Sequence, residues 1–304
     1  MNLETLPWYS GTFSMAPVSI TALTETLGRL MEAVDLVYAF EYEALELNPM
    51  FLDERAGRHR FLKGEMESRK AVRGALSGSS LWQKDNGTLS GAISMKSGFA
   101  VHGAVRDALT VLKDWNREFK ECSGQGERLY VTTGMSAALD MMNISLAHLS
   151  RLIVNRLLRL MSPKFSGLHE FLGQDMQTVE LIQRRITGID ERICRLSTPC
   201  GLYHQAMLNE RFDLSGDLGD GAVTAGHIAD LIYILLAVEG YHCMEIFKKY
   251  LRRPDGAGTA VLYEQMRQSA GSVSFEQILE VESVKCLVSL LENITFDAGG
   301  GEHK

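Results

Sequence analysis

A helical repeat of apolar residues runs through most of this chain and limits what it can fold into. In the clearest stretch, apolar residues recur at steps of three and four: Ile20, Leu23, Leu27, Leu30, Val34 and Val37. This spacing predicts a long helix over residues 18–47 that ends at Asn48-Pro49. Only 6 of the 304 residues are prolines, so little in the sequence interrupts long helices.

The same period predicts five further helices, and alternating strand patterns are almost absent. They span residues 103–120, 134–161, 176–196, 227–251 and 275–293. Residues 77–98 contain no convincing helix, and residues 208–225 form a polar, Gly-rich connector. We therefore expect an all-α bundle of long helices in a single domain over residues 1–296, with a flexible tail at 297–304.

Composition excludes several classes of protein. The formal charge of −7 argues against a dominant nucleic-acid footprint, and 45% hydrophobic residues suffice for a sizeable core. The five cysteines are scattered without a Cys-x-x-Cys pair, which indicates thiols in a reducing compartment rather than a disulfide framework or a structural zinc site. The N-terminus lacks a signal-peptide pattern, and the apolar run 231–238 is too short to span a membrane. We expect a cytoplasmic protein with no nucleic-acid or membrane partner.

Taken without any relative, the residues offer little chemistry. Lys96 stands in an otherwise uncharged, Gly/Ser-rich stretch, where it is either an anion ligand or an exposed lysine. His102 precedes a predicted helix start and is more readily a capping or packing residue than a catalytic base. His242 is assigned to the core or to an interface. The Met-rich stripe of the third helix, Met135, Met141 and Met142, is assigned to the core.

Four motifs occur in a fixed order along the chain. Residues 101–109 read Val-His-Gly-Ala-Val-Arg-Asp-Ala-Leu, residues 138–140 read Ala-Leu-Asp, and Ser-Pro and Ser-Gly-Leu occur within 157–172. Gly-Thr, Tyr-Glu and Arg follow within 258–267. Together these motifs resemble the histidine and phenylalanine ammonia-lyase family. The resemblance implies a long central bundle, shared with the fumarase-like lyases, and tetramers whose active sites combine several subunits.

The resemblance also implies what this chain lacks. The family's electrophile is a methylidene-imidazolone that forms from an Ala-Ser-Gly tripeptide in its N-terminal part, and this chain matches only the C-terminal part. No Ala-Ser-Gly occurs in the 304 residues, and Leu76-Ser77-Gly78 has the wrong first residue and the wrong place. We therefore expect no cofactor in this chain, with the imidazolone present only if a partner supplies it, and no metal.

The family's site positions fall on altered residues. Ser10 matches an asparagine that contacts the prosthetic ring, and is a candidate catalytic residue. Ile93 matches the catalytic tyrosine and cannot move a proton. Lys96 matches the arginine that binds the substrate carboxylate, and keeps its charge but not its bidentate fork. Asn209 and Glu210 fall near the family's Gln-Glu-Asp loop, within one or two residues, as a candidate substrate ligand and a candidate catalytic acid.

Three functional hypotheses follow. In the first, the chain is a subunit of a split ammonia-lyase- or aminomutase-like complex, inactive alone, with a separate chain bearing the N-terminal part. In the second, it is a catalytically dead scaffold or a binding module for an amino-acid-like acid. In the third, the fold carries a new chemistry that needs no imidazolone. The apolar stripe of residues 134–161 predicts a homo- or hetero-oligomer in any case.

Overall fold

Helices make up almost all of the chain that the structure describes. The computed structural model describes residues 16–53, 63–84, 92–122, 125–166, 176–199, 218–270 and 281–294. The long helices are α1 (Ala16–Leu45), α4 (Gly98–Glu121), α5 (Gln125–Leu160), α7 (Met176–Leu196) and α8 (Leu218–Lys249). The shorter elements are η2 (Pro49–Leu52), α2 (Gly64–Ala75), η4 (Ser80–Gln83), α3 (Ile93–Lys96), α6 (Pro163–Ser166), α9 (Ala257–Ala270) and α10 (Val281–Asn293). No strand occurs among these residues, which confirms the predicted all-α class.

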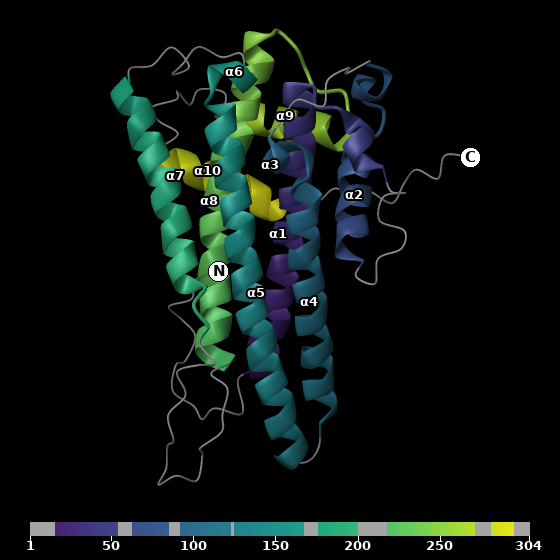
Figure 1. Cartoon of the computed structure of the whole chain (residues 1–304), viewed down its shortest axis with the longest axis vertical. Coiled ribbons are helices and arrows are strands. Elements are labelled where there is room, and N and C mark those ends of the chain that lie inside the picture. The colour runs from purple at the N-terminus through teal and green to yellow at the C-terminus, as the bar shows by residue number, and fades with distance from the viewer. Residues whose placement is uncertain are drawn as a thin grey trace, which may run out of the picture.

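Four long helices, α1, α4, α5 and α8, pack along a common axis (Figure 1). The outer helix α7 packs on α5 and α8, and α2 packs on α4 and α1. The short helices α3 and α6 lie near the upper end of the bundle in Figure 1, where α9 and α10 also cross it. The bundle agrees with the architecture that the helical period and the family resemblance predicted.

The core is formed by the apolar faces of these helices, and α1 lies at its centre. The predicted stripe of α1 is buried from Ile20 to Val37, but so are nearly all residues from Leu30 to Ala44 on every face of that helix. Because the neighbouring helices surround α1, its polar residues are buried as well, including Asp35, Glu41 and Glu43. These buried carboxyl groups need polar partners from other helices.

The helix predictions were correct in the apolar segments and wrong at polar ones. Helix α7 has the predicted bounds, whereas α5 begins at Gln125 and α8 at Leu218, within the predicted connector. Helices α2 and α9 were not predicted. The buried face of α2 carries mostly polar and small residues, whereas α9 is a short helix that buries Leu262, Tyr263 and Met266. Met135 and Met142 are buried as expected, but Met141 is 39% exposed, which corrects its assignment to the core.

Helix α8 is long and apolar enough to cross a membrane by length and composition alone. In the structure, 56% of its most apolar window is buried inside the protein, against α5 and α1. A central helix of a bundle passes the same test as a membrane span, so this helix is weak evidence for a membrane.

Candidate functional site

The corner around Lys96 is the one predicted site position that carries charge and lies among the described residues. Lys96 is the last residue of α3, and its side chain is partly buried. The Lys96 ammonium group lies 5.5 Å from the centre of the Phe51 ring, which follows α1 along the chain. The cation therefore lies over an aromatic ring at one end of the bundle, and it is partly exposed.

Ile93 begins the same short helix, three residues before Lys96. That spacing places the two side chains on neighbouring positions of one helical face. Ile93 is 76% exposed, so a large apolar side chain stands in solvent where the family's tyrosine is expected. The corner therefore offers a cation and an apolar surface, and Ile93 supplies no group for proton transfer.

The other three predicted site residues lie outside the described residues. Ser10 precedes α1, and Asn209 and Glu210 lie in the segment 200–217 before α8. Their roles as catalytic or substrate-binding residues remain predictions. The corner as described consists of Lys96, Ile93 and Phe51.

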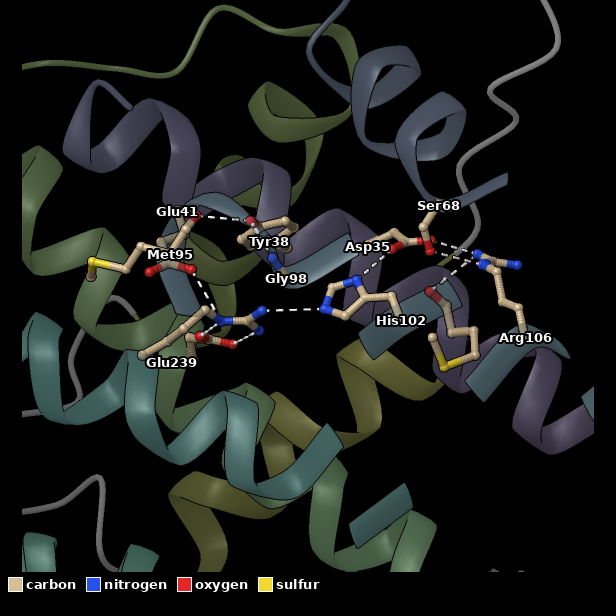
Figure 2. Close-up of polar contacts among 11 residues, drawn as sticks. Asp35, Tyr38, Glu41, Ser68, Met95, Gly98, His102, Arg106 and Glu239 are labelled. Carbon is tan, nitrogen blue, oxygen red and sulfur yellow. Dashed lines mark hydrogen bonds and ion pairs between the residues drawn. The ribbon is translucent and has the colours of Figure 1, made fainter. Parts of the chain in front are cut away.

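A buried polar network lies in the core, and the sequence reasoning missed it as a unit. Asp35 of α1 lies at one end (Figure 2). Its Oδ1 is 2.7 Å from Nδ1 of His102, and its Oδ2 is 2.5 Å from Nη2 of Arg106 and 3.3 Å from the Ser68 hydroxyl. Burial alone would raise the pKa of Asp35, but the hydrogen bond with His102 and the charge of Arg106 hold it below its ordinary value.

His102 links Asp35 to a second cluster. Its Nε2 lies 3.2 Å from Nη1 of Arg156, which can only donate, so Nε2 accepts and the imidazole proton sits on Nδ1. Burial lowers the pKa of His102, and the nearby arginine charges oppose the effect of Asp35. The structure favours the interpretation of His102 as a packing residue over that of a catalytic base, because the ring is fully buried and both nitrogens have hydrogen-bond partners.

The second cluster pairs Arg156 of α5 with two carboxyl groups. Nε and Nη2 of Arg156 lie 2.7 Å and 3.0 Å from the two carboxylate oxygens of Glu239 in α8. Oε2 of Glu41 lies 3.2 Å from the same Nε, and all three side chains are fully buried. Burial raises the pKa of Glu41 well above its ordinary value; the charge of Arg156 opposes this shift and that of Glu239 adds to it. Glu41 therefore favours its neutral form, and Arg156 is balanced by Glu239.

The 101–109 motif has a packing role in this fold. Gly103 of α4 lies against the backbone of Glu65 in α2, which a Cβ atom would overlap. The backbone N–H of Gly64 donates to Oδ1 of Asp107 at 2.8 Å. Together with the bond from Arg106 to Asp35, these contacts fix where α2 crosses α4 and α1.

The Gly-Thr motif of α9 also has a structural role. The Thr259 hydroxyl donates to the buried carboxyl group of Glu43, which also accepts from the Ser79 hydroxyl at 2.5 Å and the Gly256 N–H at 3.0 Å. These bonds join the end of α1 to the start of α9. They give Thr259 a structural role, and Gly258 lies close to Ala75 of α2, where a Cβ atom would be 3.1 Å from that residue.

The buried network has no access to a small molecule, because its central side chains are fully buried. Among the described residues, no group of three or more His, Cys, Asp or Glu side chains could hold a metal ion. The candidate site is therefore the Lys96 corner, and the network joins α1, α4, α5 and α8 in the core.

Comparison with known proteins identifies the family of this arrangement. The model of a family described as aromatic amino acid lyase matches residues 2–119, which include α1, α2, the Lys96 corner and the 101–109 motif. Residues 2–119 belong to the aromatic amino acid lyase family. The resemblance drawn from the motifs is thereby confirmed. No curated protein matches the chain in sequence.

Solved structures of lyases and aminomutases share this fold over most of the chain. Ergothionase from Treponema denticola superposes with a TM-score of 0.82 at 18% identity, over 91% of this chain and 59% of its own. Tyrosine aminomutase from Streptomyces globisporus superposes with a TM-score of 0.80 at 17% identity, over 91% of this chain and 60% of its own. Histidine ammonia-lyase from Trypanosoma cruzi superposes with a TM-score of 0.75 at 16% identity, over 91% of this chain and 55% of its own. The chain thus spans about 55–60% of the length of these structures, and at such identities the likeness shows the fold alone.

Proposed function

We propose that this aromatic amino acid lyase-family chain is the carboxylate-binding subunit of a split ammonia-lyase- or aminomutase-like complex. The observation that carries the proposal is which of the family's functional residues this chain keeps and which it lacks. The cation at the carboxylate position persists as Lys96, while the tyrosine position is Ile93 and the tripeptide that makes the electrophile is absent from the 304 residues. A binding function thus has its key residue here, and in the proposed complex the catalytic functions come from another chain.

The described residues do not fit the family's prosthetic group. Ile93 has no polar atom with which to contact an imidazolone or move a proton, and it is exposed rather than enclosed. We therefore derive no step through that group in this chain. In the proposed complex, the partner chain would carry both the imidazolone and the residues that serve it.

Lys96 would bind and orient the substrate's carboxylate. Its ammonium group is a point charge with three rotatable donors, so it attracts the anion without the two-point geometry of an arginine. The Phe51 ring beneath it keeps the ammonium near one place without neutralising it. Ile93 would contact an apolar part of the same ligand, which suits an aromatic acid.

The apolar stripe of α5 on which the oligomer prediction was based is buried within this chain, against α4 and α8, so an assembly would have to use another face of the helix. Met141 and Ile144 lie three residues apart on this helix and are 39% and 41% exposed, within a helix that is otherwise packed on α4 and α8. A partner chain or a second copy that covered this line would remove apolar surface from water.

A binding module without any catalysis is the second candidate, and Ile93 favours it. A corner that binds an aromatic acid but cannot move a proton is sufficient for a sensor or scaffold, which binds its ligand without changing it. The two functions differ in what a partner adds: an electrophile in the first, and nothing chemical in the second.

The test is reconstitution. The chain alone should form neither cinnamate from phenylalanine nor urocanate from histidine, and should bind cinnamate by calorimetry. Co-expressed with a chain that carries Ala-Ser-Gly and copurifies with it, the complex should deaminate an aromatic amino acid, and Lys96→Met in this chain should abolish that activity. Deamination by the purified chain alone would refute the split. Binding of cinnamate by a copurified complex that has no activity would favour the binding module.

A further inference from the structure

We propose that Tyr38 of α1 is a positioning residue that fixes the Lys96 corner to the helix bundle. The proposal rests on the proposed function, in that Lys96 is taken as the carboxylate ligand. Tyr38 lies beneath the corner rather than in it. It is fully buried and has no route to a ligand.

The phenol of Tyr38 bridges the break between α3 and α4. Its hydroxyl donates to the carbonyl oxygen of Met95 at 2.8 Å and accepts from the backbone N–H of Gly98 at 2.9 Å (Figure 2). Met95 and Gly98 stand on either side of Lys96 and Ser97. Backbone groups at helix ends lack partners within their own helix. One side chain from α1 therefore supplies partners on both sides of the residue that carries the cation.

The closeness of this contact depends on glycine. A Cβ atom on Gly98 would lie 2.8 Å from Cζ and 3.1 Å from the hydroxyl of Tyr38, and 3.1 Å from Nη1 of Arg156. Such distances are shorter than van der Waals contact, so any larger residue at 98 would push the phenol or the chain away. Gly98 thus lets α4 begin directly on the Tyr38 hydroxyl.

The phenol itself is held by the buried network. The Arg156 guanidinium lies 4.7 Å from the centre of the Tyr38 ring, and the His102 ring packs against it edge-on at 5.1 Å. Burial raises the pKa of Tyr38 well above its ordinary value, so the hydroxyl keeps the proton that it donates to Met95. The network around Arg156 is thereby coupled to the position of Lys96 through one ring.

Tyr42 adds a weaker contact one turn further along α1. Its hydroxyl donates to the carbonyl oxygen of Lys96 itself at 3.4 Å, and its ring packs edge-on against Tyr38 at 5.1 Å. The longer distance indicates a weaker bond. Tyr38 should therefore dominate, with Tyr42 as a secondary support.

The test replaces only the hydroxyl. In Tyr38→Phe the ring remains, while the Met95 carbonyl and the Gly98 N–H lose their partner. We expect the backbone segment 95–100 to exchange its amide hydrogens about tenfold faster in hydrogen-exchange mass spectrometry. We expect Lys96 to be acetylated several-fold faster relative to Lys113, an exposed lysine of α4 that serves as internal standard. Cinnamate should bind about tenfold more weakly, and Tyr42→Phe should shift each quantity less.

Tyr233→Phe is the matched control, since Tyr233 is a buried tyrosine of α8. It should leave segment 95–100, Lys96 acetylation and cinnamate binding unchanged even if it lowers the melting temperature. If Tyr38→Phe does not fold, Gly98→Ala displaces the phenol instead and should give the same faster acetylation of Lys96.

The proposal is overturned if exchange and Lys96 acetylation in Tyr38→Phe match the parent, or if Tyr233→Phe changes them equally. If cinnamate binds neither the parent chain nor its complex, the proposed function fails. The exchange and acetylation rates still decide whether Tyr38 holds Lys96 in that case, so the two failures can be told apart.

Discussion

The interior around Arg156 and the corner at Lys96 both carry a cation, but the two regions use it differently. Arg156 is fully buried, with a bidentate carboxylate partner and a histidine beside it. Lys96 is partly buried at the end of a four-residue helix, on an aromatic ring and next to an exposed isoleucine. The interior cation therefore fixes the helices relative to one another, while the corner cation lies at the partly exposed end of a short helix, on an aromatic ring.

The comparison also shows how closely support and site are connected. The Tyr38 ring touches Arg156 on one side, and its hydroxyl holds the backbone around Lys96 on the other. Damage to the interior should therefore unfold the protein, whereas damage to the corner should remove binding only. The four predictions below test that division, from the largest expected effect to the smallest.

Replacing Arg156 should have the largest effect on stability. Arg156→Met leaves Glu239 buried without its partner, which should lower the free energy of unfolding by about 3–5 kcal/mol in urea denaturation. The double variant Arg156→Met/Glu239→Met should recover part of this loss, because no buried charge is then left uncompensated. Arg184→Met, at a 75% exposed side chain, is the control and should stay within about 0.5 kcal/mol. A loss below about 1 kcal/mol for Arg156→Met would show that the cluster is not what holds the interior.

The crossing of α2 and α4 should be the next most sensitive point. Gly103→Ala places a methyl group on the backbone of Glu65 and should cost about 2–3 kcal/mol. Gly188→Ala in α7 meets nothing within 4 Å and should stabilise by about 0.5–1 kcal/mol, since alanine favours a helix over glycine. Thermal unfolding of the two variants measures both effects. Equal melting temperatures for the two would contradict the close contact.

The interior should also impose a pH dependence on stability through His242. Burial lowers the pKa of His242 to about 4, so it stays neutral in the folded state while the unfolded chain gains a proton below about pH 6.5. Its contribution is therefore present at pH 7 and lost as pH falls, by about 2 kcal/mol at pH 5. Glu41 works in the opposite direction: its raised pKa makes the folded state bind the extra proton, so its contribution is lost as pH rises above about 4.5.

The difference between the parent and His242→Gln isolates the histidine from that opposing effect. When the pH is lowered from 7 to 5, the free energy of unfolding in urea should fall by about 2 kcal/mol more in the parent than in His242→Gln. An identical pH dependence in the two proteins would mean that the histidine takes up its proton in the folded state.

Replacing Lys96 should have the smallest effect on stability and the clearest effect on binding. Lys96→Met should change the free energy of unfolding by less than about 0.5 kcal/mol, because the side chain is only partly buried. Cinnamate binding should weaken by about 30-fold or more, and Lys96→Arg should retain it. If Lys96→Met lowered the free energy of unfolding as much as Arg156→Met, the two regions would not differ in their contribution to stability.

The sequence predicted the helices where one apolar face was enough to define them. Helix α7 had its bounds assigned in advance, since its buried face repeats at the helical period. The bounds of α2 were not predicted, because its buried face carries Glu65, Ser68 and Arg69. Glu65 and Arg69 form an ion pair within the helix, and Ser68 bonds Asp35 of α1. Hydrophobic periodicity cannot detect a face that is buried through ion pairs and hydrogen bonds.

The candidate site divides in the same way. Lys96 and Ile93 were found by matching residues to a family motif, and local sequence was enough for that. Asp35, His102, Arg156 and Glu239 come from four places along the chain, and nothing near each of them in sequence indicates the others. His102 alone was noticed, but its partner Asp35 is 67 positions away.

By itself the sequence determined the all-α class, the long helices and the charge at position 96, because these depend on neighbouring residues and on residue type. Only the tertiary structure decided which polar groups are buried together, since packing α1 among its neighbouring helices brings its carboxylates to arginine and histidine from α4 and α5. The tertiary structure likewise decided that Tyr38 lies under Lys96. The hydrogen bond between the Tyr38 phenol and the Met95 carbonyl joins residues 57 positions apart. It leaves no pattern in the sequence, because it depends only on how α1 and α3 are placed relative to one another.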